Sequence, residues 1–433
     1  MLYHRASSVA RNVVIVGGGL AGLAASIYLA RGGRTVTVFE KRQYLGGRAI
    51  TQLRHGYRFN LGAHAFYRTG AGARVCRELG IPVPGVEPKP RIQALLDGDE
   101  RMFPAGVFSL LGTSLLSVRG KAQLIRALLR IRRIELNPPE NMTVRDWVEA
   151  NVSDARARQV LEALIRLATY SNQADRADAK LALAQLKIGL KGTIYVHEGW
   201  QRIVDSLRNT AVTSGVNFVS SSRIVGVDVD AGRVRSIRLG GLELDSDRMD
   251  TMSIAYPETA PDHGDGAPLP AENVILAVDP ATASELAGQT WSAEPVTASC
   301  LDVALRKLPN PKRTFALGID EPLYYAVHSQ WAQLAPKGGA LIHTVKYGRG
   351  EERELEALLD RMQPGWREHV VHRRYMPSMT VSNALVTPGA QRPPVTTSVR
   401  GLYLAGDWVG EEGLLSDASF ASARAAAKAI LET

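Results

Sequence analysis

Three glycines, Gly17, Gly19 and Gly22, follow a short run of β-branched residues in the spacing G-x-G-x-x-G. At this spacing the first glycine permits a tight turn and the second lets backbone approach a pyrophosphate. The third lets a helix pack closely on a strand. The start of that helix would offer free N–H groups and a partial positive charge to the phosphates. Glu40 ends the next expected strand, where its carboxylate can bind both hydroxyls of a ribose. These residues predict a bound dinucleotide.

The elements that must position these residues are a strand, a helix and a second strand. Val13–Val16 is apolar on both faces, as expected of a strand buried in a parallel sheet. The helix runs through apolar residues at 3–4 spacing and ends at Gly32-Gly33, before a second strand at Thr35–Phe39. A glycine-rich turn in an ordinary βαβ unit is the alternative, but strand, helix and terminal acid together favour the dinucleotide.

Two later segments should lie beside the same ligand. The loop Leu45-Gly46-Gly47-Arg48 follows Glu40 too closely for another crossover, and its arginine suits a second phosphate contact. A plain surface turn is the alternative for this loop. Gly56–His64 alternates like a strand and ends in Gly62-Ala63-His64, where a glycine often marks close approach of backbone to a ligand.

Length and composition indicate a globular protein of two or more structural domains, with 433 residues, 45% of them hydrophobic and 22% charged. No apolar stretch reaches the roughly 20 residues that span a bilayer. The first residues, MLYHRASSVARN, lack the apolar core of a signal peptide, so we expect a cytoplasmic location.

The cysteines and the charge exclude several classes of partner. Cys76 and Cys300 are the two cysteines, and they form neither a CxxC pair nor a cluster with histidine. We therefore expect no disulfide framework and no metal site. The net charge of +9 comes without a nucleic-acid-binding motif, so we expect no nucleic-acid partner and assign most of the charge to solvated surface.

Residues 119–134 predict an amphipathic helix. Its apolar face carries Leu124, Leu128 and Ile131, and its basic face carries Arg126, Arg130 and Arg133. A basic amphipathic helix can make a peripheral contact with a membrane surface, which would make the protein membrane-associated. The alternative is a helix of the substrate-binding domain with a solvated basic face.

The glycine turn, Glu40, the Gly46-Gly47-Arg48 triplet and the Gly62-Ala63-His64 segment together resemble the flavin-dependent amine oxidase superfamily. That superfamily includes monoamine oxidases, protoporphyrinogen oxidases and phytoene- and squalene-type desaturases, and the A-G-D-W wording at Gly406-Asp407 is most similar to the desaturase branch. The resemblance implies an α/β fold with a discontinuous Rossmann-like FAD-binding domain, containing a parallel sheet, and an α+β substrate-binding domain. The FAD-binding domain would comprise residues 1–85, 196–284 and 396–433, and the substrate-binding domain residues 86–195 and 285–395.

The resemblance also implies which residues hold FAD. No cysteine lies in the family's region of covalent attachment, here about Tyr375–Thr380, so the cofactor should be non-covalent. The cofactor-binding residues implied are Gly17, Gly19, Leu20, Ala21, Gly22, Glu40, Lys41, Gly46, Gly47, Arg48, Gly62, Ala63, His64, Ile224, Val225, Ala277, Gly406, Asp407 and Leu415. Candidate catalytic residues beside the flavin are His64, Tyr67 and Trp408. His64 could act as an acid or a base, or serve as a structural histidine.

Three positions depart from the family pattern. Amine oxidases place a lysine under the flavin from a strand that corresponds to about Thr297–Leu301, where this chain has none, and Leu414 stands where they have an aromatic wall. An aliphatic wall suits an apolar substrate better than an amine. Asp417 would place a negative charge where the family's backbone amides lie against the flavin's pyrimidine end, and so disfavour a reduced anionic flavin.

The expected activity is that of an FAD-dependent desaturase or dehydrogenase. It would transfer hydride from a hydrophobic, isoprenoid-like or polycyclic substrate to flavin N5, with oxygen or a quinone as the electron acceptor. A flavin amine oxidase is the main alternative. A flavin isomerase without net redox chemistry and a lipid-binding carrier without activity are further alternatives.

Overall fold

The structure is a computed structural model that describes residues 12–103, 113–135, 139–240 and 268–433. Residues 1–11, on which the expectation of a cytoplasmic location depends, lie outside the described residues. Among the helices that are described, none has both the length and the apolar character needed to cross a bilayer.

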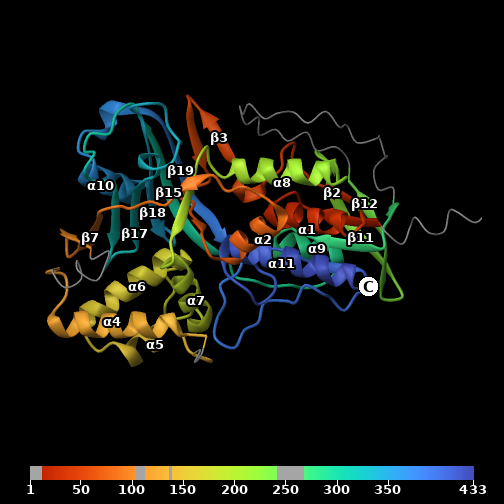
Figure 1. Ribbon diagram of the computed structural model, residues 1–433, viewed down its shortest axis with the longest axis horizontal. Helices are drawn as coiled ribbons and strands as arrows, with labels where there is room; N and C mark the ends of the chain where they lie inside the picture. The colour runs from red at the N-terminus through yellow and green to blue at the C-terminus, as the bar shows by residue number, and fades with distance from the viewer. Residues whose placement is uncertain (1–11, 104–112, 136–138, 241–267) are drawn as a thin grey trace, which may run out of the picture.

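A five-stranded parallel sheet forms the centre of one half of the molecule (Figure 1). Its strands, in spatial order, are β10 (Asn217–Val219), β2 (Thr35–Phe39), β1 (Asn12–Val16), β14 (Asn273–Leu276) and β20 (Leu402–Leu404). Each neighbouring pair is parallel. Side chains of β1 alternate between the two faces of the sheet, with Val13 and Ile15 in one core and Val14 and Val16 in another. The strand is apolar throughout because both faces are buried.

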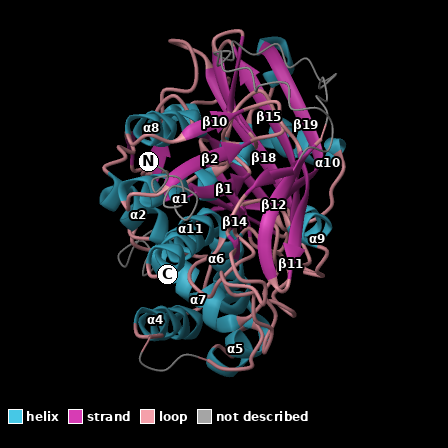
Figure 2. Ribbon diagram, turned by 90° about the vertical axis from the view of Figure 1, so that its right-hand side faces the viewer, coloured by secondary structure: helices cyan, strands magenta, loops and turns pink. Residues whose placement is uncertain are grey.

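Layers of different kinds cover the two faces of this sheet (Figure 2). Helices α1 (Leu20–Arg31), α2 (Ala71–Leu79), α8 (Gln201–Thr213) and α11 (Leu415–Leu431) supply the core on one face. The antiparallel strands β11 (Ile224–Asp230), β12 (Arg233–Leu239) and β13 (Pro268–Pro270), together with α9 (Pro280–Ala287), supply the core on the other. A parallel sheet with both faces covered confirms the predicted Rossmann-like architecture.

The other half contains a seven-stranded sheet of mixed direction. Its strands, in spatial order, are β19 (Val370–Ser382), β15 (Val296–Leu305), β18 (Ala340–Tyr347), β17 (Leu323–Val327), β16 (Phe315–Gly318), β7 (Ile92–Leu96) and β8 (Asp99–Met102). On β15 the odd-numbered side chains Leu301, Val303 and Leu305 pack with α10 (Glu352–Met362). The even-numbered side chains Cys300 and Asp302 therefore occupy the opposite face.

Four helices cover the β7 end of that sheet (Figure 1). They are α4 (Val118–Arg132), α5 (Val144–Asn151), α6 (Ala155–Thr169) and α7 (Ala179–Gly189). Each begins at a residue whose side chain accepts a backbone N–H of the first turn, namely Ser117, Thr143, Asp154 and Asp178. The predicted amphipathic helix is confirmed as α4, and its residues Leu124, Ala127 and Ile131 are buried in the core between these helices.

Short elements connect the two halves. The strands β3 (Thr51–Arg54) and β4 (Tyr57–Asn60) form a hairpin. The strand β9 (Thr193–Val196) pairs with both β5 (Phe66–Tyr67) and β6 (Gly85–Val86). Short 3-10 turns occur at η2 (Gly47–Ala49), η3 (His328–Gln330) and η4 (Trp366–His369). Because β9 continues into α8, its end joins the core of the parallel half.

Candidate functional site

The glycine turn between β1 and α1 leaves room for a ligand on one side only. Gly17 has a φ of +106°, and its N–H donates to the carbonyl of Phe39 at 2.8 Å. A Cβ added to Gly22 would lie 2.0 Å from the carbonyl oxygen of Gly17, whereas a Cβ added to Gly19 would meet no atom within 4 Å. No side chain caps the start of α1. The turn is therefore closed against the sheet and open above Gly19, where a pyrophosphate would lie.

Glu40 lies at the end of β2, beside this turn. Its side chain is 9% exposed, and its Oε2 accepts the N–H of Gly18 at 2.8 Å. Its Oε1 accepts the N–H of Arg42 at 3.0 Å. These bonds fix the carboxylate at the end of the strand, beside the glycine turn. The side chain of Lys41, the neighbouring predicted contact, is exposed.

The Gly46-Gly47-Arg48 loop lies directly against the glycine turn, as predicted. The N–H of Gly46 donates to the carbonyl of Gly18 at 2.8 Å, and Gly46 forms a parallel bridge with Gly19. Gly46 has a φ of +118°, a conformation that favours glycine. The loop is thus held against the glycine turn by backbone contacts.

Asp407 connects the two ends of the chain. It is 3% exposed, and its Oδ2 accepts from the Arg48 guanidinium at 2.8 Å. Asn383 donates to the same carboxylate from its backbone N–H at 3.0 Å and from its Nδ2 at 2.9 Å. Arg392 donates to the Asp407 carbonyl at 3.1 Å. Sequence reasoning missed Asn383 and Arg392, since neither belongs to a local motif and both reach Asp407 only through the fold.

The remaining predicted cofactor residues are distributed around the same region. Ala277 donates its N–H to Val16 at 2.8 Å and lines the turn, since its carbonyl oxygen would lie 2.5 Å from a Cβ on Gly17. Ala63 and Leu415 pack in one apolar cluster of the other half. Ile224 is buried at the start of β11. The open turn, the fixed Glu40 carboxylate and the Arg48–Asp407 pair fit FAD, which these residues would hold without a covalent bond.

The three candidate catalytic residues lie in different surroundings. The Nδ1 of His64 is 3.1 Å from the carbonyl oxygen of Gly62, and the ring meets Trp200 edge to face at 5.1 Å. Burial lowers the pKa of His64 to about 4, so its imidazole is neutral near pH 7. The Tyr67 hydroxyl donates to the Ala168 carbonyl at 2.7 Å, and Trp408 donates its Nε1–H to the Val278 carbonyl at 2.8 Å. The polar atoms of Tyr67 and Trp408 thus hold neighbouring elements together.

Asp417 contacts a different element from the one expected. Its Oδ1 accepts the N–H of Gly72 at 2.7 Å, in the first turn of α2, and its side chain is buried. Burial raises the pKa of Asp417 to about 6. The carboxylate is therefore directed to the start of α2, where the helix dipole favours a negative charge, and the expectation that it faces the flavin is corrected.

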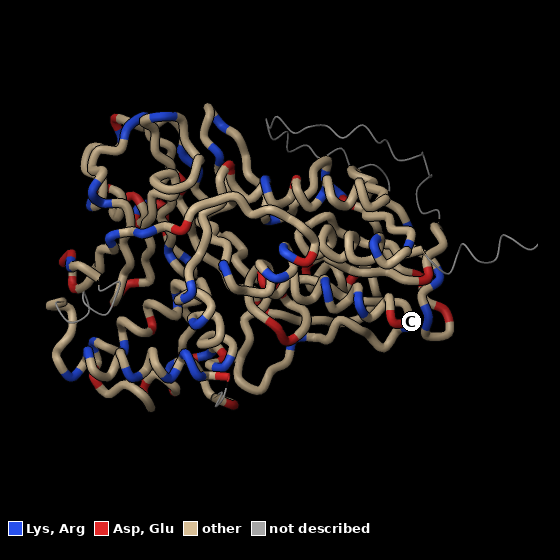
Figure 3. Tube along the Cα trace, in the orientation of Figure 1, with Lys and Arg blue, Asp and Glu red and all other residues tan. Residues whose placement is uncertain are grey.

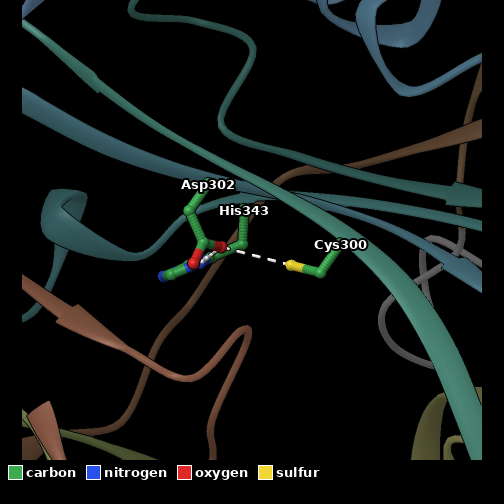
Figure 4. Close-up of side chains that lie close together, drawn as sticks. All are labelled: Cys300, Asp302 and His343. Carbon is green, nitrogen blue, oxygen red and sulfur yellow. Dashed lines mark hydrogen bonds and ion pairs between the residues drawn. The ribbon is translucent and has the colours of Figure 1, made fainter. Parts of the chain in front are cut away.

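A buried polar network lies on the seven-stranded sheet (Figure 4). The Oδ1 of Asp302 accepts from His343 Nδ1 at 2.6 Å and from the Cys300 thiol at 3.2 Å. Its Oδ2 is paired with the Arg374 guanidinium. Cys300, Asp302 and His343 have ligand atoms within 4.8 Å of one another, the spacing of a metal site. The carboxylate oxygens are already bonded to donors, and Arg374 already supplies a positive charge, so we interpret the cluster as a hydrogen-bonded network.

Sequence reasoning missed this network because its members come from three strands. Asp302 is opposite His343 on β18 and opposite Arg374 on β19. Burial would raise the pKa of Asp302, but His343 and Arg374 outweigh burial and hold it well below the usual value. The one local signal is the alternation of Cys300 and Asp302, which places both on the same face of β15.

Comparisons with known proteins agree on the family and the fold. The model of the family described as "Flavin containing amine oxidoreductase" matches residues 20–304. The 1-hydroxycarotenoid 3,4-desaturase of Flavobacterium sp. (strain P99-3) is 45% identical over 56 residues, which are 13% of this chain and 12% of that enzyme. The chain thus matches only a small part of that relative.

Solved structures match nearly the whole chain at low identity. An oxidoreductase from Methanosarcina mazei has a TM-score of 0.75 and 19% identity, with 98% of this chain and 100% of that chain covered. Cyclohexylamine oxidase from Brevibacterium oxydans IH-35A has a TM-score of 0.66 and 13% identity, with 97% and 98% covered. At these identities the likeness establishes the fold alone.

Proposed function

The chain belongs to the flavin containing amine oxidoreductase family, and from this premise we propose that it is a desaturase or dehydrogenase of a hydrophobic, isoprenoid-like or polycyclic substrate. When bound, FAD supplies a hydride acceptor. The protein's part is to hold the cofactor through the glycine turn, Glu40, Arg48 and Asp407, and to surround the reacting carbon with a dry, apolar wall.

The observation that carries this proposal is the apolar cluster next to the FAD-binding loops. Ala63 and Leu415, from two cofactor motifs, pack in one cluster with residues of the seven-stranded sheet and α6. The larger members of that cluster are Phe315, Tyr324, Tyr347, Tyr170, Met376 and Met379. These packed side chains make the surroundings of the two cofactor motifs largely apolar, which suits an apolar substrate better than an amine.

The charges of the sheet support the same choice. The segment Thr297–Leu301 corresponds to the one in which amine oxidases carry their lysine. Lys346 of the neighbouring strand β18 lies opposite Ser299 of that segment. Ser299 is an odd-numbered residue of β15, so Lys346 lies on the face that packs on α10, and its ammonium pairs with Glu354 of that helix. Lys346 therefore does not replace the lysine that is missing at Thr297–Leu301.

An apolar groove adjoins the start of α11. Leu181, Val296, Leu385, Leu414 and Leu415 are among the residues that line it. A second cavity of about 270 Å³, between α5 and α6, shares Thr169, Ser171, Ala177 and Ala182 with this groove. The groove would admit one end of an apolar molecule beside the FAD-binding loops, whereas Arg145, Glu162 and Asp320 make the second cavity polar.

The test is anaerobic bleaching of the bound flavin. Protein purified with riboflavin available should carry flavin absorbance, and isoprenoids or steroids from a panel should bleach it, whereas amines should not. Leu181→Trp should slow bleaching by isoprenoids by filling the groove, and the control Val212→Trp, at an exposed site on α8, should not. Bleaching by amines alone would establish an amine oxidase instead. We propose oxygen or a quinone as the electron acceptor. Comparing the rates at which the two reoxidise the reduced flavin identifies which one acts.

We also propose that α4 makes a peripheral contact with an anionic membrane surface. Its apolar face is buried in the helical core, so the contact would involve the opposite face. That face carries arginines together with Val118 and Leu129, which are 84% and 53% exposed. Elsewhere the basic residues are spread over both halves and interleaved with acidic ones (Figure 3), which favours a solvated surface and no nucleic-acid partner.

A further inference from the structure

The network of Asp302, His343 and Arg374 lies on the sheet face that looks toward the FAD-binding half. Cys300, on the same face, has its Sγ 3.6 Å from the position of a Cβ on Gly62. His64, two residues further along that loop, interacts electrostatically with both His343 and Asp302. The network therefore adjoins the loop of Gly62 and His64, which the family resemblance would place beside the flavin.

The hydrogen bonds of His343 leave one ring nitrogen available. The imidazole is fully buried and its Nδ1 is bonded to the Asp302 carboxylate at 2.6 Å. A carboxylate that is ionised accepts hydrogen bonds and donates none, so Nδ1 carries the proton. The other nitrogen, Nε2, is then a basic lone pair, and it has no hydrogen-bond partner among the described residues. A buried acceptor left without a donor is unfavourable, so Nε2 would gain by taking up a proton.

We infer that His343 is the proton acceptor of the active site, with Asp302 and Arg374 as positioning residues. The inference rests on the proposed dehydrogenase function and adds the base that this function needs. Converting CH–CH to C=C removes a hydride and a proton from adjacent carbons. FAD, when bound, would accept the hydride with its electron pair, the electron pair of the second C–H bond would form the C=C bond, and His343 Nε2 would take up the proton.

Asp302 suits the role of orienting this imidazole. It holds the ring in the tautomer with a free Nε2, and its negative charge stabilises the imidazolium that forms. Arg374 balances that charge while the imidazole is neutral, and its guanidinium also donates to Gln52 at 3.0 Å. The guanidinium thereby fixes the carboxylate from the β19 side.

Other titratable groups surround the imidazole and could contribute to the dependence of the rate on pH. They are Cys300 and Asp302 on β15, Arg374 on β19, His328 in η3, Tyr324 on β17, Tyr195 on β9 and His64. The His328 ring meets the His343 ring edge to face at 4.5 Å, and its Nε2 bonds the Tyr324 hydroxyl at 2.9 Å. Burial lowers the pKa of both His328 and His64, and it raises that of Tyr324, so these groups stay neutral near pH 7.

The first experiment measures the state of the two ring nitrogens without any substrate. Holoprotein labelled with ¹⁵N-histidine is compared with His343→Gln, and the signals that disappear belong to His343. We expect a protonated Nδ1 with a downfield proton and an unprotonated Nε2 at pH 7. A proton on Nε2 at pH 7 overturns the inference, whatever the substrate proves to be.

The second experiment measures the rate of anaerobic flavin reduction by the panel compound that bleaches the wild type fastest. His343→Gln should lower this rate about 100-fold or more and remove the dependence on a group that must be deprotonated. Asp302→Asn should lower the rate through the wrong tautomer. The control His369→Gln, at a half-buried site in η4, should leave rate and pH profile unchanged. FAD content and near-UV circular dichroism show that each variant is folded.

The outcomes separate this inference from the proposed function. Bleaching by no panel compound contradicts the proposed function, and the NMR result then decides whether His343 presents a free proton acceptor. Bleaching of His343→Gln at the wild-type rate with the wild-type pH profile overturns the inference and leaves the proposed function intact. If His343→Gln fails to fold, the rate of flavin reduction in Asp302→Asn and the ¹⁵N-histidine NMR spectrum of the wild type test the inference in its place.

Discussion

Arg48 and Asp407, separated by 359 positions in the sequence, form an ion pair of 2.8 Å between the Gly46-Gly47-Arg48 loop and the Gly406-Asp407 motif. The carboxylate is buried while the guanidinium remains 42% exposed, so Arg48 can also reach a phosphate. The pair closes the FAD-binding region around a sheet whose strands come from both ends of the chain.

Arg48→Ala should weaken FAD binding. The substitution removes a cation from the cofactor region and leaves the Asp407 charge with the two hydrogen bonds of Asn383 alone. We expect the Kd for FAD to rise about tenfold, equivalent to about 1.4 kcal/mol, in a fluorescence titration of apoprotein. Arg68→Ala, which breaks the exposed pair with Glu87, is the matched control and should leave this Kd unchanged. Equal affinities for all three proteins would contradict a role for Arg48.

Gly19→Ala should weaken FAD binding, whereas Gly22→Ala should lower the stability of the fold. The Cβ at position 19 enters open space and the backbone φ of −77° suits alanine, so the fold should tolerate it while FAD binding weakens at least tenfold. The Cβ at position 22 would lie 2.0 Å from a backbone oxygen and should destabilise the apoprotein by about 1–3 kcal/mol. Urea unfolding and FAD titration distinguish the two. Unimpaired FAD binding by Gly19→Ala would argue against a pyrophosphate above the turn.

Asp417→Asn should change how stability depends on pH. The pKa of Asp417 is raised from 3.8 to about 6, so the folded protein binds this proton more tightly than the unfolded chain. The stabilisation that this proton gives the folded state is complete at pH values below the pKa that Asp417 has in the unfolded chain. It is lost as the pH rises through about 6. The amide does not titrate and can still accept from Gly72. Relative to wild type, Asp417→Asn should therefore gain on the order of 2 kcal/mol between pH 4 and pH 8. Parallel curves of unfolding free energy against pH would refute this account of Asp417.

The basic face of α4 should bind vesicles that contain phosphatidylserine. Arg126→Glu with Arg133→Glu should reduce co-sedimentation with such vesicles, and added salt should weaken the wild-type binding. A control of equal charge change, Arg235→Glu with Arg353→Glu, uses exposed residues on other elements and should still bind. If wild type does not sediment with anionic vesicles, the basic face of α4 is solvated surface.

The glycine turn, Glu40 and the Gly46-Gly47-Arg48 loop could be located from the sequence because they lie within one βαβ unit. Neighbours along the chain place these groups at one edge of the sheet, and local stereochemistry selects glycine there. The amphipathic pattern of residues 119–134 likewise predicted α4, because its 3.6-residue period needs no distant contact.

Contacts across the fold could not be predicted in this way. Asn383 and Arg392 reach Asp407 from a segment with no motif, and Asp417 is directed to Gly72 because α11 packs against α2. Sequence position alone put Asp417 at the flavin, whereas the direction of its side chain depends on helix packing.

Short-range spacing in the sequence by itself therefore predicted a bound dinucleotide, and the resemblance of several motifs to a known family indicated FAD and the residues that would hold it. Only the tertiary structure decided which polar groups meet inside the second half. Asp302, His343 and Arg374 belong to three strands, and they come together because register across β18, β15 and β19 sets them side by side. Strand register is fixed by packing on both faces of the sheet, which no single segment of the chain encodes.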